Sequence, residues 1–93
     1  MLKVNEYFGG SVKSIALTTE EGPATVGVIE PGTYEFGTST IEVMKVVSGL
    51  LAAKLPGAAE WAVFGPGQSF TVPAGVRFQV EAKADVAYLC LYR

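Results

Sequence analysis

Side chains able to do acid–base or nucleophilic chemistry are few in this chain of 93 residues. Histidine is absent, and cysteine occurs once, at Cys90. The absence of histidine excludes Ser–His–Asp triads, Cys–His dyads, histidine metal sites and histidine proton shuttles. Cys90 stands between Leu89 and Leu91 with no cation beside it, so we expect a buried, inert thiol. The candidates that remain are carboxyl, guanidinium, hydroxyl and aromatic side chains.

The charges exclude some classes of partner. The formal net charge is -2 and the pI is about 5.0, which speaks against nucleic acid, since that requires a basic stripe. The seven lysines and arginines are scattered, so no membrane-binding patch is expected. The N-terminal residues lack the pattern of a signal peptide, and no apolar run is long enough to span a bilayer. The predicted compartment is the cytoplasm.

The elements that must position any site are short strands. Glycine and proline turn signals recur at close intervals, and runs rich in Val, Ile, Leu, Tyr and Phe lie between them. No window predicts a convincing helix. The predicted strands are Val12–Thr18, Ala24–Glu30, Thr33–Phe36, Ile41–Ser48, Leu50–Leu55, Trp61–Phe64, Ser69–Val72, Arg77–Glu81 and Val86–Tyr92.

About nine short strands are unstable as one open sheet, so they should close into a barrel or form two facing sheets. The prediction is an all-β protein with a single domain over residues 1–93. Apolar residues make up 49% of this small chain, so we expect an exposed apolar patch and a homodimer.

The clearest local motif is a glycine followed, after five residues, by a Pro-x-Gly turn. Gly67 ends a loop, a strand follows, and Pro73-Ala74-Gly75 forms a tight turn. This spacing matches the second cupin motif, G-x5-P-x-G-x2-H, with Phe78 at the histidine position. The end of the first cupin motif, a glutamate and a glycine with six residues between them, matches Glu42 and Gly49.

The two histidines of that first motif fall near Phe36 and Thr38, or one residue earlier, and no histidine stands at either place. The chain therefore resembles a single-domain cupin, a jelly-roll β-barrel, that keeps only the glutamate of the four usual metal ligands. We expect no metal and no other cofactor, since one carboxylate without histidine is a poor site for Fe, Mn or Zn.

A closer resemblance runs nearly end to end. It rests on Asn5–Phe8, Val12–Ile15, Val26–Val28, Glu42–Met44 through Ser48-Gly49, and Tyr88–Cys90 with Tyr92. In these segments the chain resembles the small pyrimidine/purine nucleoside phosphorylase family of cupins. The resemblance implies metal-independent phosphorolysis, in which nucleosides and phosphate give a free base and α-D-ribose 1-phosphate.

Phosphorolysis needs groups that orient the ribose, hold phosphate and assist the departing base. The resemblance implies that Glu42 accepts hydrogen bonds from the ribose hydroxyls, unless it is a surface glutamate. Arg77 follows the tight turn and is the candidate that forks onto phosphate, unless it is a solvated or interface arginine. Both are candidate catalytic residues. The candidate substrate-binding residues are Tyr34, Phe36 and Phe78 as an aromatic wall, Thr38 and Ser39 in a hydroxyl-rich loop, Gln79, and Tyr92. The alternatives are an ordinary barrel core for the aromatic rings, an ordinary polar loop, and a Gln79 that faces water.

The chain departs from the family pattern at one position. The family has a basic residue between the last cysteine and the last tyrosine, where this chain has Leu91; Arg93, on the same strand face, is a weak substitute. Two other functions therefore stay open. One is a non-catalytic cupin that binds a small metabolite, and the less favoured one is a metal-dependent cupin that uses Glu42 with other oxygen ligands.

Overall fold

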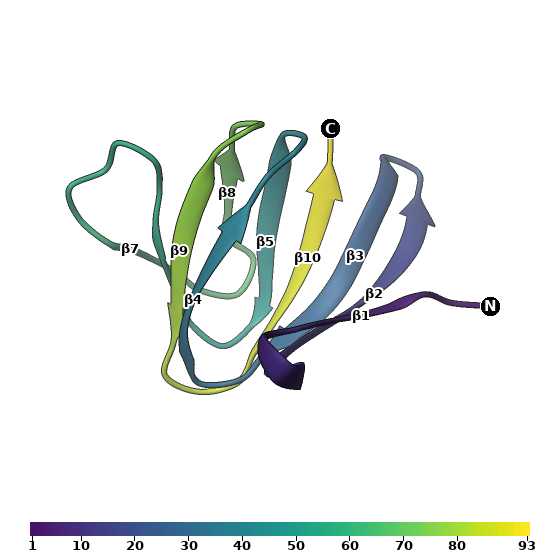
Figure 1. Ribbon diagram of the computed structural model, residues 1–93, viewed down its shortest axis with the longest axis horizontal. Coiled ribbons are helices and arrows are strands. Elements are labelled where there is room, and N and C mark those ends of the chain that lie inside the picture. Colours follow the sequence, from purple (N-terminus) through teal and green to yellow (C-terminus); the bar gives the residue numbers. More distant parts are fainter.

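The computed structural model describes residues 1–93 as two antiparallel β-sheets that face each other (Figure 1). One three-residue 3₁₀ turn, η1, interrupts the strands, and no helix is long and apolar enough to cross a bilayer. The elements in chain order are β1 (Val4–Tyr7), η1 (Phe8–Gly10), β2 (Val12–Thr19), β3 (Gly22–Ile29), β4 (Gly32–Gly37), β5 (Glu42–Ser48), β6 (Leu51–Lys54), β7 (Ala62–Phe64), β8 (Ser69–Val72), β9 (Arg77–Ala82) and β10 (Val86–Tyr92).

The larger sheet has six strands in the order β1-β2-β3-β10-β5-β8, and the smaller has four in the order β4-β9-β6-β7. The all-β prediction is confirmed, and all nine predicted strands form, with ends that shift by at most two residues. Strand β1 was not predicted; its residues Val4-Asn5-Glu6-Tyr7 pair with β2 at the edge of the larger sheet. None of the four is fully buried, so this strand lacks the apolar pattern by which the others were recognised.

Alternation along the strands builds the core between the sheets. In β9, Phe78 and Val80 are buried while Arg77 and Gln79 are exposed, as the sequence predicted. Cys90 is buried and free, which is also as predicted. Fifteen buried residues form one apolar cluster, with Val46, Leu51 and Val80 among the most enclosed. The inner faces of both sheets therefore supply the walls of any site between them.

The Pro73-Ala74-Gly75 turn joins β8 to β9 and holds the loop that links β4 to β5. Gly67 and Gly75 have φ angles of +84° and +71°, which glycine adopts without strain. The Thr38 hydroxyl donates to the Pro73 carbonyl at 2.6 Å and accepts from the Val76 amide at 3.1 Å. Backbone bonds join Thr38 N to Val76 O and Gly75 N to Thr38 O. The two cupin-like motifs are thus tied together at one end of the molecule.

Candidate functional site

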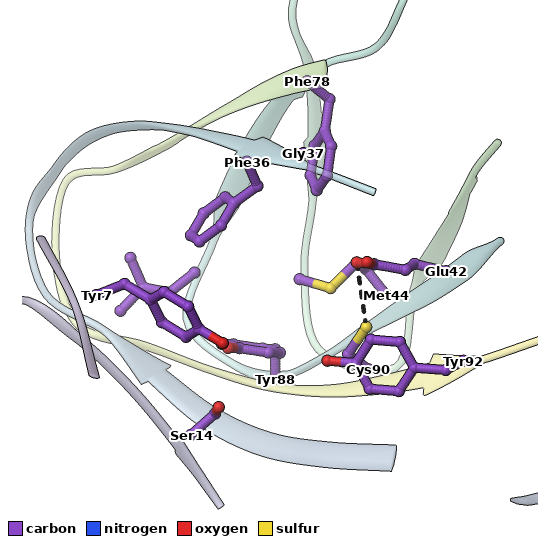
Figure 2. A pocket seen from close by; sticks show the side chains of 11 residues that line it. Tyr7, Ser14, Phe36, Gly37, Glu42, Met44, Phe78, Tyr88, Cys90 and Tyr92 are labelled. Carbon is purple, nitrogen blue, oxygen red and sulfur yellow. Dashed lines mark hydrogen bonds between the residues drawn. The ribbon is translucent and has the colours of Figure 1, made fainter. Parts of the chain in front are cut away.

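A cavity of about 110 Å³ lies between the two sheets and opens to solvent. Figure 2 shows side chains from both sheets and from the N-terminal strand pointing into it. Its lining residues are Tyr7, Ser14, Ile29, Phe36, Gly37, Glu42, Met44, Phe78, Tyr88, Cys90 and Tyr92. Gly37 and Glu42 flank the β4–β5 loop, so this loop borders the cavity.

Glu42 is the acidic group of the cavity. It is the first residue of β5, pairs with Tyr92 at the end of β10, and is partly buried. The Cys90 thiol donates to Glu42 Oε1 at a sulfur–oxygen distance of 3.5 Å. Burial raises the pKa of the Glu42 carboxyl above its ordinary value, and the bond from Cys90 opposes this rise. Burial and the Glu42 charge raise the pKa of the Cys90 thiol to about 12, so it stays protonated.

Hydroxyl groups supply the other polar contacts of the cavity. Tyr92 Oη and Thr25 Oγ1 lie 3.0 Å apart, and the Asn5 amide donates to Ser14 Oγ at 3.4 Å. Burial is the main cause that raises the pKa of Tyr88 to about 12, and it raises the pKa of Tyr92 as well. Both phenols are therefore neutral at physiological pH and able to donate hydrogen bonds.

Aromatic rings form the wall supplied by the smaller sheet. The rings of Phe36 and Phe78 have centroids 6.0 Å apart and planes inclined by 33°. Tyr7 and Phe8, from the N-terminal segment, meet Phe36 edge-on at 6.2 Å and 5.4 Å. The site therefore has flat apolar surfaces from β4 and β9 and polar groups from the larger sheet (Figure 2).

Gly27 makes room for one of the phenols. It pairs with Tyr88 across β3 and β10, and a Cβ atom built on Gly27 would lie 2.5 Å from Tyr88 Cζ and Oη. The Tyr88 ring thus lies directly against the β3 backbone. The φ angle of Gly27 is not in the left-handed region, so the close approach of the Tyr88 ring is the reason that this position is a glycine.

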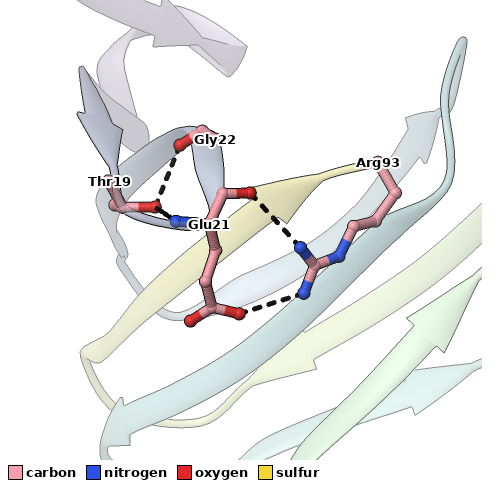
Figure 3. Close-up of polar contacts among 4 residues, drawn as sticks. All are labelled: Thr19, Glu21, Gly22 and Arg93. Carbon is pink, nitrogen blue, oxygen red and sulfur yellow. Dashed lines mark hydrogen bonds and ion pairs between the residues drawn. The ribbon is translucent and has the colours of Figure 1, made fainter.

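No lysine or arginine lines the cavity. Arg77 lies on the outer face of β9, with its side chain 79% exposed and Nη1 3.3 Å from Glu35 Oε2. Arg93 also points away, because its guanidinium bonds the Glu21 carboxylate at 3.1 Å and the Glu21 carbonyl at 3.3 Å (Figure 3). Leu91 stands between Cys90 and Tyr92, whose side chains line the cavity, so its own side chain lies on the opposite face of β10, where it is buried.

The structure brings four of the nine predicted site residues together at the cavity: Phe36, Glu42, Phe78 and Tyr92. It places the other five elsewhere. Arg77 and Gln79 lie on the outer face of β9, and Ser39 is exposed in the β4–β5 loop. Thr38 is held by the Pro73–Val76 turn, and the Tyr34 hydroxyl donates to the Glu30 carbonyl at 2.8 Å.

Sequence reasoning did not assign Tyr7, Ser14, Tyr88 or Cys90 to the site. A signal existed for two of them, since Tyr88 and Cys90 share the period-two face of Tyr92. For Tyr7 the signal was weak, because a strand tyrosine can donate a hydrogen bond without belonging to a site and because Tyr7, which pairs with Val12, lies on the strand that was not predicted. Ser14 shares the period-two face of Val12 in a predicted strand, but nothing in the sequence set its hydroxyl apart.

The cavity residues do not fit the metal that most cupins hold. Phe36, Thr38 and Phe78 stand at the histidine positions, which leaves Glu42 and the protonated Cys90 thiol. No three His, Cys, Asp or Glu side chains come together anywhere in the chain. Fe, Mn and Zn sites need at least three such ligands, so the donor set is insufficient.

Two facing antiparallel sheets around a cavity that carries the first-motif glutamate define a protein of the cupin class. An RmlC-like cupin from Shewanella frigidimarina has the same fold, with a TM-score of 0.75 at 22% identity over 96% of this chain and 80% of that one. The chain belongs to the pyrimidine/purine nucleoside phosphorylase family, whose model matches residues 2–92.

Relatives from Pseudomonas that have the family name match this chain over their full length. The pyrimidine/purine nucleoside phosphorylase of Pseudomonas putida is 60% identical over 100% of this chain and 99% of its own. That of Pseudomonas aeruginosa is 57% identical over 100% of both. Among solved structures, a protein of unknown function from Vibrio parahaemolyticus has a TM-score of 0.92 at 41% identity, covering 97% of this chain and 96% of that one. One from Acinetobacter has a TM-score of 0.92 at 35% identity, covering 98% and 90%.

Proposed function

We propose that this chain is a metal-independent nucleoside phosphorylase that converts purine and pyrimidine nucleosides and phosphate into a free base and α-D-ribose 1-phosphate. The names of the Pseudomonas relatives support the substrate class. The structural observation that carries the proposal is the Glu42 carboxyl, which reaches into a cavity between aromatic rings and phenol hydroxyls. Enzymes that transfer a ribosyl group in this way are pentosyltransferases.

The size of the cavity suggests how a nucleoside would sit. Pockets that enclose whole ligands usually measure about 300–1,000 Å³, whereas this cavity measures about 110 Å³. It has room for either the base or the ribose of the nucleoside, and the other part would lie at the opening of the cavity. Phe36 and Phe78 offer a flat surface, while Glu42 and Tyr92 offer hydrogen bonds. Few groups would read the edge of the base, which fits a broad substrate range.

Phosphate must approach from the open side, since no cation lines the cavity. Arg77 remains the proposed phosphate ligand. It begins β9 directly after the turn that is tied to the β4–β5 loop, and its present partner is an exposed ion pair with Glu35. Exposed pairs of this kind contribute only about 0–1 kcal/mol, so the guanidinium is free to move to a bound anion.

The test is to incubate the protein with inosine, uridine, adenosine and cytidine separately, with and without phosphate, and to measure the free base. The proposal expects base release that depends on phosphate. A folded protein that releases no base from any of the four would overturn it. Metal analysis of the purified protein is the companion measurement, and a stoichiometric bound metal would refute the metal-independent mechanism.

The lack of a cation in the cavity favours a second candidate, a non-catalytic cupin that binds a small metabolite. Such a protein would bind nucleosides in calorimetry and release no base. Restoring a basic residue at Leu91 would not separate the candidates, because Leu91 lies on the face of β10 opposite the cavity.

We also propose that the chain works as a homodimer, with a cytoplasmic location as the accompanying prediction from the sequence. On the outer face of the larger sheet, Val4, Ile15, Val26 and Leu89 lie side by side across four strands. Val26 is 46% exposed, and the neighbouring Leu17 and Val28 are 38% and 51% exposed.

Strands lie about 5 Å apart and alternate side chains about 7 Å apart, so this apolar face covers roughly 400 Å². That is about half of the roughly 800 Å² per partner in a standard interface. A second copy, with the same face and the polar rim around it, would complete such an interface.

A further inference from the structure

Glu42 carries the only carboxyl group that lines the cavity. The other polar groups there are two buried phenols, a third phenol, a hydroxyl and a thiol, namely Tyr88, Tyr92, Tyr7, Ser14 and Cys90. Tyr88 and Cys90 have pKa values of about 12, and Tyr92 is shifted in the same direction. Glu42 is therefore the side chain of the cavity best suited to pass a proton to a bound substrate.

The surroundings of Glu42 favour its neutral form. No cation lines the cavity, and the two chain termini and all seven lysines and arginines lie outside its lining. The hydrogen bond that the structure gives to the carboxyl comes from the Cys90 thiol at 3.5 Å, and a thiol is a weak donor. An ionised carboxylate loses water here and gains little in return, which favours protonation.

The geometry points to Glu42 as the general acid that protonates the departing nucleobase. This role deepens the proposed phosphorolysis and rests on it. It replaces the role that the family resemblance suggested, in which an ionised Glu42 accepts hydrogen bonds from the ribose hydroxyls.

The step balances without any further reactant. A phosphate oxygen forms a bond to C1′ of the ribose while the bond between C1′ and the base nitrogen breaks. The electron pair of that bond goes to the base, and the Glu42 proton neutralises the charge that would develop there. Glu42 ends as a carboxylate and takes a proton from solvent at the opening of the cavity.

A protonated Glu42 also removes an electrostatic conflict. Two like charges in a site with few counterions repel each other strongly. An ionised Glu42 would oppose the entry of a phosphate dianion into a cavity that offers no cation, whereas a neutral carboxyl does not.

The deciding experiment compares wild type and Glu42→Gln with guanosine and 7-methylguanosine, each with phosphate. Guanine leaves readily only when its ring nitrogen is protonated, whereas the 7-methyl base already carries a positive charge. Glu42→Gln should lower kcat for guanosine by roughly 10²- to 10⁴-fold, the usual contribution of a general acid. Its kcat for 7-methylguanosine should stay within about tenfold of wild type.

An equal loss on both substrates would overturn the inference, because a residue that holds the ribose serves both alike. The pH profile gives a second measurement that does not need 7-methylguanosine. The kcat/KM of wild type for guanosine should fall as the pH rises through the Glu42 pKa, and Glu42→Gln should lack this fall. A variant that keeps the same alkaline fall contradicts the role of Glu42.

Wild-type activity separates this inference from the proposed function. If wild type releases no guanine in the presence of phosphate, phosphorolysis itself fails. If wild type is active and both substrates suffer equally in Glu42→Gln, only the role of Glu42 fails. Glu60→Gln, the same change at an exposed loop position, is the matched control and should leave both rates unchanged.

Discussion

Gly27 and Tyr88 show how a single missing side chain shapes the cavity. An alanine Cβ at position 27 would lie 2.5 Å from the Tyr88 ring, which could move only toward the space between the sheets. We predict that Gly27→Ala costs about 1–3 kcal/mol of unfolding free energy, as overpacked sites do, and that it lowers kcat/KM. Urea unfolding and steady-state kinetics measure the two effects.

The matched control is Gly27→Ala combined with Tyr88→Leu. If the ring is the cause of the strain, the alanine should cost less stability in the leucine background than in the wild type, since contacting residues are not additive. Equal costs in the two backgrounds would show that the strain lies elsewhere.

Glu42 should make the folded chain less stable as the pH rises, whereas a carboxyl with a lowered pKa has the opposite effect. Because burial raises its pKa in the folded chain, its contribution is fully present below the ordinary carboxyl pKa and is lost as the pH rises through the raised value. We therefore predict that the unfolding free energy of Glu42→Gln relative to wild type is higher at pH 8 than at pH 4. Urea unfolding at both pH values tests this, and a difference that does not change with pH would refute it.

For single residues, the direction of a side chain could be predicted from the sequence where a motif fixed its place in a strand. The frame around Glu42 pointed to an inward carboxyl, and the structure places it on the cavity wall. Arg77 was placed by its distance from the turn alone. Alternation on β9 directs its side chain outward once Phe78 faces the core, so the two cannot share one wall.

Among the elements, the β4–β5 loop depends on one threonine. Thr38 satisfies the Val76 amide and the Pro73 carbonyl through the same hydroxyl, and it is largely buried. Thr38→Val keeps the shape and leaves these groups without a partner, so we predict a loss of about 1–3 kcal/mol. KM for the nucleoside should also rise, because the loop borders the cavity. Thr71→Val, on the exposed face of β8, should leave the stability nearly unchanged.

Arg77 and Arg93 can be compared as candidate ligands of phosphate. Arg77 has one exposed ion pair, while Arg93 is held by two bonds to Glu21. We predict that Arg77→Ala raises KM for phosphate several-fold and that Arg93→Ala does not. Phosphate titrations of both variants measure this. No change in Arg77→Ala would move the phosphate ligand to another group.

Strand prediction worked because turn residues and period-two alternation mark most elements independently of each other. It failed at β1, where Asn5 and Glu6 interrupt the apolar pattern and pairing with β2 supplies the stability instead. Without β1, the position of Tyr7 at the cavity could not be predicted. Contacts between strands that are far apart in the sequence, such as Glu42 with Cys90, depend on the register of the whole sheet and leave no local signal in the sequence.

At the scale of the whole molecule, the outer face of the larger sheet governs association. Val26 lies in the middle of the apolar row, between Ile15 and Leu89. We predict that Val26→Glu converts the dimer into a monomer, because it places a charge at the centre of the contact. Light scattering after size-exclusion chromatography measures the mass.

Val63→Glu is the control for this experiment. Val63 is 61% exposed on the smaller sheet, so the charge is added on another part of the surface. A wild type that runs as a monomer at micromolar concentration would remove the basis for the dimer. A Val63→Glu monomer beside a Val26→Glu dimer would move the interface to the smaller sheet.

The central claim is that phosphate, and not water, attacks the sugar. Phosphorus NMR of a mixture of the protein, uridine and inorganic phosphate tests this most directly. We expect a ribose 1-phosphate resonance to grow as the inorganic phosphate resonance declines, in step with the release of uracil. Uracil release with the phosphate resonance unchanged would mean that water attacks the sugar, and phosphorolysis would be ruled out.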